Sequence, residues 1–230
     1  MKKITLFFLA IICLSFSAIQ TKEEAKEIAA TNIVKMKEGM LLVRLYNKHK
    51  VIEALEEKGM SKRAETIKNN QIKINKEIIN AFTRFNFCEV KFFYSDDSEN
   101  LIEGDFSKLV LFDDTTFAQR KVELTQNFFV ADFGYLPGKD KSRTETNPKK
   151  ISGIEIQKRY KGGSVSTKIK CMYIRNSELS PLGDPFPLYV RFHPTPLSQL
   201  TYQQVVQKMN SQLSSYYESV SQTKTSKIEH

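Results

Sequence analysis

The segment between residues 40 and 94 most constrains the fold, because strand-like and helical stretches follow one another there in an informative order. The run from Met40 to Tyr46 is dense in Leu and Val, as β-strands are. Two amphipathic helical stretches follow, over Lys48 to Lys58 and from Ser61 to about Arg84. The run from Phe87 to Tyr94 is strand-like again. A strand, a helical connection and a second strand of this size predict a right-handed crossover between parallel strands.

The rest of the chain predicts further strands, with a helix at each end. A β-hairpin is expected where two strand-like stretches enclose Gly162 and Gly163. The other segments are a helix over Lys22 to Lys37, strands over Leu109 to Phe112, Asn127 to Tyr135, Ile154 to Tyr160, Val165 to Arg175 and Leu188 to Phe192, and an amphipathic helix over Ser198 to Val220. Together they predict an α+β fold: a mixed β-sheet of about six strands with a βαβ-like N-terminal half, an antiparallel C-terminal meander and a C-terminal amphipathic helix, with the helices mainly on one face.

The first twenty residues are typical of a secretory signal peptide. Lys2 and Lys3 precede an apolar run from Ile4 to Phe16, and small residues follow it. This run is shorter than the roughly twenty residues that a membrane-spanning helix needs. We therefore expect cleavage after Ser17 and export to the periplasm or the extracellular space. Residues 18–230 are expected to form a single globular domain without a transmembrane segment, and the polar stretch around 137–150 to be a mobile loop within it.

Composition and charge narrow the classes of partner. The chain is 40% hydrophobic and has sixteen Phe residues, enough for a substantial core. Its formal net charge is +9, to which Lys2 and Lys3 of the leader contribute. Dispersed lysines of this kind either give solubility or contact an anionic polymer or lipid. Nucleic acid is not an expected partner, because no nucleic-acid-binding module is recognisable and the leader directs the chain to export.

Cysteines, histidines and acidic loops predict no metal or cofactor. Cys88 and Cys171 lie in strand-like runs, where each fits as a buried thiol. An oxidising compartment also permits a disulfide between them, provided that their strands are neighbours. The three histidines are far apart in the sequence, and the acidic loops lack the ligand order of a calcium-binding loop.

Charged residues within apolar strands are the candidate binding residues. They are Arg44, Glu89, Asp132 and Arg191. If Arg44 and Glu89 are neighbours across the crossover, a cross-strand ion pair should form. Partly buried charges often mark ligand sites, but the same pattern also suits a sheet with one half-solvated face.

No recognisable catalytic motif is present: the chain has no nucleophile elbow, phosphate-binding loop or dinucleotide fingerprint. The sequence therefore favours a non-catalytic binding or accessory component of the cell envelope or extracellular space, with another envelope protein or an anionic polymer as partner. One alternative is a hydrolase that acts on an envelope polymer through strand carboxylates such as Asp132 or Glu89. The other is a basic peripheral module that binds an anionic polymer or lipid surface.

Overall fold

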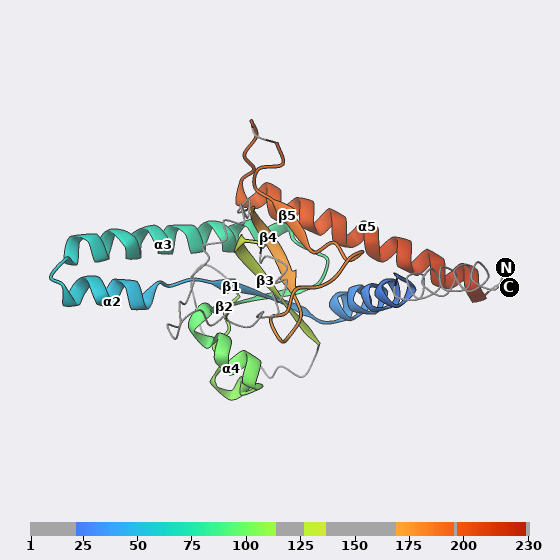
Figure 1. Ribbon diagram of the computed structural model, residues 1–230, viewed down its shortest axis with the longest axis horizontal. Coiled ribbons are helices and arrows are strands. Elements are labelled where there is room, and N and C mark those ends of the chain that lie inside the picture. The colour runs from blue at the N-terminus through green and yellow to red at the C-terminus, as the bar shows by residue number, and fades with distance from the viewer. Residues whose placement is uncertain (1–21, 114–126, 137–168, 196, 229–230) are drawn as a thin grey trace, which may run out of the picture.

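A single mixed sheet organises the protein. The computed structural model describes residues 22–113, 127–136, 169–195 and 197–228 (Figure 1). Within these ranges five strands lie in the order β2-β1-β3-β4-β5. The strands are β1 (Met40–Leu45), β2 (Glu89–Tyr94), β3 (Phe128–Tyr135), β4 (Lys170–Arg175) and β5 (Tyr189–Arg191). Both β2 and β3 are parallel to β1, whereas β4 and β5 continue the sheet antiparallel. The predicted parallel pair and C-terminal meander are thus confirmed.

The helices agree with the predicted segments, with one addition. They are a helix over residues 22–38, α2 (His49–Glu57), α3 (Ser61–Ala81), α4 (Ser98–Glu103) and α5 (Tyr202–Ile228), with short 3-10 turns η1 (Phe82–Arg84), η2 (Ser95–Asp97) and η3 (Phe106–Lys108). The short helix α4 is the addition. In the described ranges no helix combines the length and the apolar character needed to span a bilayer.

Some predicted elements differ or fall outside the described residues. The strand predicted over residues 109–112 is reduced to bridge residues at Leu111 and Phe112, of which Phe112 forms an isolated antiparallel bridge with Phe92. The amides of Phe92 and Phe112 each donate to the other's carbonyl, over 2.9 and 3.0 Å. The predicted leader, the polar loop around 137–150 and the first strand of the predicted hairpin lie outside the described residues.

The two faces of the sheet bury different cores. Because side chains alternate along a strand, Leu41, Val43 and Leu45 face one side and Met40 and Leu42 the other. The first side carries the larger core, to which the helix over residues 22–38, α3 and α5 contribute. The second side carries a smaller core, to which α4 contributes. The helices therefore lie mainly on one face, as predicted, while α2 and the start of α3 extend past the sheet and α2 buries no residue (Figure 1).

Gly39 joins the N-terminal helix to β1 at a point of close backbone approach. The amide of Met40 donates to the carbonyl of Asn127 over 3.1 Å. A Cβ on Gly39 would overlap that same carbonyl and come within 2.8 Å of the carbonyl oxygen of Lys35. We expect Gly39→Ala to lower the free energy of unfolding by about 1–3 kcal/mol, the usual cost of overpacking.

Urea denaturation of the purified variant measures this effect. Gly183→Ala is the matched control, because a Cβ at Gly183 meets no atom within 4 Å. Equal midpoints for the two variants would contradict the close approach at Gly39.

Candidate functional site

The four predicted charged residues lie on one face of the sheet but do not form one cluster. Register places Glu89 opposite Met40, whereas Arg44 lies opposite Phe93 at the other end of the pair. The expected ion pair between Arg44 and Glu89 is therefore not formed. Glu89 instead contacts Lys91 at 3.0 Å, and the exposed Arg191 contacts the hydroxyl of Tyr189 at 3.4 Å.

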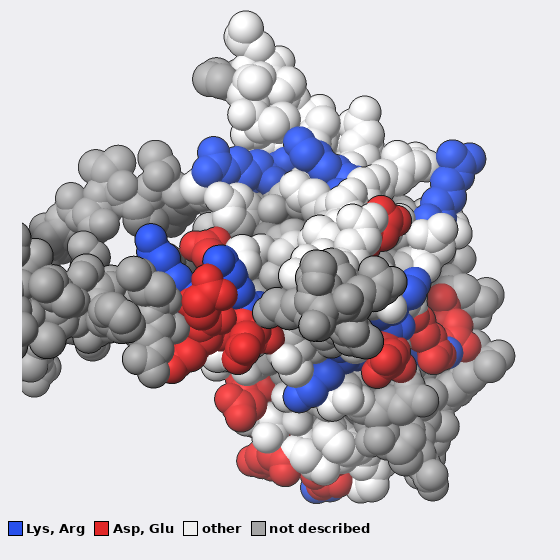
Figure 2. Space-filling model, turned by 90° about the vertical axis from the view of Figure 1, so that its right-hand side faces the viewer, with Lys and Arg blue, Asp and Glu red and all other residues white. Residues whose placement is uncertain are grey.

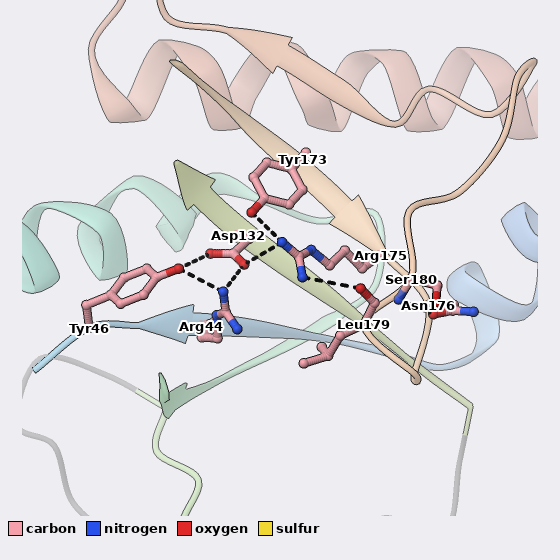
Figure 3. A network of polar contacts seen from close by, with 8 residues as sticks. All are labelled: Arg44, Tyr46, Asp132, Tyr173, Arg175, Asn176, Leu179 and Ser180. Atoms are coloured by element: carbon pink, nitrogen blue, oxygen red, sulfur yellow. Dashed lines mark hydrogen bonds and ion pairs between the residues drawn. The ribbon is translucent and has the colours of Figure 1, made fainter. Parts of the chain in front are cut away.

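Arg44 and Asp132 do meet, at the centre of a polar network on neighbouring strands (Figure 3). Asp132 is fully buried in β3. Nη2 of Arg44 lies 2.5 Å from its Oδ2, and Nη2 of Arg175 lies 3.6 Å from the same oxygen. The hydroxyl of Tyr46 donates to Oδ1 over 2.9 Å. The contacts to Oδ2 are ionic, since no donor among the described residues makes a directed hydrogen bond to that oxygen.

Two tyrosines extend the network outward. Nη2 of Arg44 donates to the hydroxyl of Tyr46 over 2.8 Å, and Nη2 of Arg175 donates to the hydroxyl of Tyr173 over 2.6 Å. Each guanidinium also lies over the ring of its tyrosine, at 5.3 Å for Arg44 and 4.8 Å for Arg175. Nη1 of Arg175 donates to the carbonyl of Leu179 over 3.2 Å. Together, the Asp132 network consists of Arg44, Tyr46, Asp132, Tyr173 and Arg175.

Three members of the network were missed by sequence reasoning, although a signal exists. Residues two apart on a strand share a face, so an arginine and a tyrosine at this spacing can pair. The spacing occurs as Arg44 with Tyr46 and as Tyr173 with Arg175. The pairing of β3 with β4 then places Tyr173 directly opposite Asp132.

The network holds one more positive charge than negative. Arg44 and Arg175 are 15% and 18% exposed, against 0% for Asp132. Burial is the largest single influence on Arg44 and lowers the pKa of its guanidinium, but the Asp132 carboxylate together with Tyr46 and Tyr173 outweighs it, so that the pKa is raised. Burial, followed by the same carboxylate, also raises the pKa of Tyr46. The buried Nε atoms of both arginines have no hydrogen-bond partner among the described residues, so the network offers donors in excess.

Burial and the Asp132 carboxylate also raise the pKa of Tyr173 to about 12, from an ordinary value near 10. When the pKa of a phenol is higher in the folded than in the unfolded protein, the group stabilises the fold fully at pH values below the unfolded pKa. This stabilisation is lost as the pH rises through the folded pKa. We therefore expect Tyr173 to make stability fall between about pH 10 and pH 12, by roughly 2–3 kcal/mol.

Denaturation curves across this pH window measure the loss. Tyr173→Phe cannot ionise and should show a shallower fall, whereas Tyr135→Phe, at a position that is 58% exposed, should follow the parent protein. Parallel curves for the parent and Tyr173→Phe would contradict the expected role of Tyr173.

Cys88 and Cys171, the two cysteines among the described residues, are free thiols, and the sheet order explains why they do not pair. Cys88 directly precedes β2 and Cys171 lies in β4, so β1 and β3 separate them. Three strand spacings amount to roughly 14 Å, whereas bridged Cα atoms lie within about 7 Å. The disulfide that the sequence left open is thus not present.

Burial raises the pKa of Cys88 to about 12 and that of Cys171 to about 11. Almost no thiolate is then present at pH 8, and the thiolate is the reactive form. We expect the folded protein without its leader to react with Ellman's reagent more slowly, on the order of 100-fold, than the same chain in guanidinium chloride. Rapid labelling of the native protein would contradict this expectation.

The Asp132 network offers charge and hydrogen-bond recognition rather than metal chemistry. Across the described ranges no three His, Cys, Asp or Glu side chains group as metal ligands would. No protein-family model matches the chain, and no curated protein or solved structure matches it significantly.

Proposed function

We propose that this protein is an exported, non-catalytic binding or accessory component of the cell envelope or extracellular space. The observation that carries this proposal is the state of Asp132, the one buried charged residue among those described. Its Oδ2 contacts Arg44 of β1 and Arg175 of β4, and its Oδ1 accepts from Tyr46, the residue that follows β1. A carboxylate whose two oxygens both contact side chains of neighbouring strands joins these strands together and does not face a substrate. The leader, with Lys2 and Lys3 before its apolar run, supports export.

The geometry disfavours the hydrolase alternative. Paired catalytic carboxylates of glycosidases lie about 5–9.5 Å apart. In the register of the sheet, Asp132 of β3 lies beside Arg44 of β1, and Glu89 of β2 lies beside Met40 of β1. The two acids are therefore four residues apart along the strands and two strands apart across the sheet. This offset corresponds to roughly 16 Å. Glu89 is also 52% exposed and paired with Lys91, so these two acids do not act as a pair.

The charges on one side of the molecule favour a protein partner over an anionic surface. On the side of the molecule shown in Figure 2, basic and acidic side chains are mixed over the lower part, and only a short row of basic side chains near the top lies apart from acidic ones. A peripheral module that binds through charge needs a continuous basic face, because isolated surface charges are screened by salt.

Export is tested by expressing the full chain and measuring the mass of the protein in each cell fraction. We expect a product that begins at Ala18 outside the cytoplasm. A matched variant, Lys2→Glu with Lys3→Glu, removes the positive start of the leader and should reduce export. An uncleaved product that stays in the cytoplasm would contradict the proposal.

The binding role is tested by affinity capture from the native cell envelope at low and then high salt, with mass spectrometry of the retained material. A defined protein retained through high salt is the expected result. Retention of anionic polymer or lipid alone, lost as salt rises, would replace the proposal with the peripheral module. Degradation of an envelope polymer by the purified protein would replace it with the hydrolase.

A further inference from the structure

The carboxyl ends of β1 and β2 form a topological switch point. The two strands are parallel neighbours. The chain leaves β1 toward the face covered by α3, whose Ile78 and Ile79 belong to the larger core. It leaves β2 toward the opposite face, where Leu101 of α4 belongs to the smaller core. In open sheets with parallel strands, ligands bind in the crevice where outgoing connections diverge in this way.

A pocket of about 460 Å³ lies at this point. Asn47 after β1 and Tyr94 at the end of β2 line it, and Nδ2 of Asn47 donates to Asp96 over 2.8 Å, which ties the two loops together. Ile52 of α2 and Ile72 of α3 supply apolar walls. Two larger hollows, of about 660 and 750 Å³, border α5, but their polar lining residues are all exposed or half-buried.

The wall of the pocket carries a hydrogen-bond acceptor of defined orientation on a largely buried residue. Asn75 and Gln71 are 3% and 6% exposed. The Asn75 amide nitrogen must donate to the carbonyl of Tyr46, at 2.8 Å, so Oδ1 of Asn75 has to accept. Gln71 therefore donates to it through Nε2, at 3.0 Å. This chain of donors fixes both amides and leaves Oε1 of Gln71 as an acceptor with no hydrogen-bond partner among the described residues.

Further acceptors line the same pocket. Glu53 and Glu56 project from one side of α2, and Glu53 lies 3.4 Å from the ring of His49. Lys68, on the α3 side, is exposed and is the one permanently charged cation in the lining. Carboxylates together with the amide oxygen of a largely buried glutamine select a ligand that donates hydrogen bonds and carries positive charge.

We propose that the pocket between α2, α3 and the ends of β1 and β2 binds small aliphatic amines, with the ammonium group bonded to Gln71 Oε1 and the Glu56 carboxylate and the hydrocarbon against Ile52 and Ile72. This proposal goes beyond the accessory role and does not depend on it. A free amine and the ammonium end of a partner's lysine side chain share this chemistry.

Three four-carbon probes of matched length test the ligand class: butane-1,4-diamine, butane-1,4-diol and butanedioate. Titrations of the isotope-labelled protein are followed through the side-chain amide signals of Gln71 and Asn75. The diamine should shift both signals saturably, with a dissociation constant on the order of 1 mM, as expected for so small a ligand. Equal or stronger binding of butanedioate, or no saturable shift with the diamine, would overturn the proposal.

Two neighbouring glutamates of α2 provide a matched pair of variants. Glu56 lines the pocket and Glu57 does not, and both are exposed, so neither substitution should affect folding. Glu56→Gln should weaken diamine binding about two- to fivefold, as for loss of one screened ion pair, and Glu57→Gln should leave it unchanged. Equal effects of the two substitutions would show non-specific charge attraction and overturn the site. An N-acetylated lysine methyl ester that binds as the diamine does would extend the site to partner side chains, whereas the free diamine alone would confine it to small molecules; either result supports the amine pocket.

Discussion

Replacing Asp132 with alanine is expected to lower the free energy of unfolding by about 3–5 kcal/mol. The substitution leaves the guanidinium groups of Arg44 and Arg175 mostly buried without their counter-charge. It also removes the acceptor of the Tyr46 hydroxyl. Chemical denaturation at neutral pH measures the change.

Two comparisons separate this effect from general damage. Arg191→Ala changes an exposed charge outside the Asp132 network and should cost less than about 0.5 kcal/mol. Converting Asp132 to Leu together with Arg44 and Arg175 to Met removes all three charges. This triple variant should recover most of the stability lost by Asp132→Ala, because apolar replacements of buried ion clusters are often neutral or stabilising. A loss at Asp132 no greater than at Arg191 would contradict the network's role in joining the strands.

Truncation of Leu213 to alanine is expected to cost about 2–5 kcal/mol. Leu213 lies in α5, is fully buried and belongs to the larger core, together with Val206 and Met209 of the same helix. The loss comes from the removed apolar surface and from the cavity left behind, because the surrounding core relaxes only in part. Thermal or urea denaturation of the purified variant measures it.

The matched control is the same substitution at Leu197, which is completely exposed. Leu197→Ala should leave the free energy of unfolding within about 0.5 kcal/mol of the parent. An unchanged stability for Leu213→Ala would mean that α5 does not cover the sheet and that its apolar stripe is instead available to a partner.

Much of the fold was predictable because local patterns of apolar residues indicate where the strands and helices lie. The density of Leu and Val in Met40 to Tyr46 and the apolar stripe of the segment after Ser61 predicted β1 and α3. The order of these elements predicted the parallel pairing with β2. Helix α4 was missed because it is six residues long and begins in a polar segment. The segment 109–112, predicted as a strand, has bridge residues at Leu111 and Phe112 and forms no named strand among the described residues.

The candidate site was predictable only in part. Arg44 and Asp132 could be selected because a charge within an apolar strand is unusual, and the structure brings them into contact. Glu89 and Arg191 were selected by the same rule, yet they lie outside the Asp132 network, because the register places Glu89 at the far end of its strand and β5 lies beyond β4. The rule predicts on which face of the sheet a charged side chain lies, but not which other charged side chain it contacts.

The sequence by itself determined the segments, the faces of the strands and the presence of charges on the sheet, because these depend on the backbone repeat of the residues nearby. Tertiary structure alone decided which strands became neighbours. Tyr46 and Asp132 are separated by 86 residues, and their contact exists because β1 lies between β2 and β3. The same arrangement sends the chain to opposite faces after β1 and β2, and so forms the pocket that Gln71 lines. Contacts between distant segments depend on how whole elements pack, which no local pattern encodes.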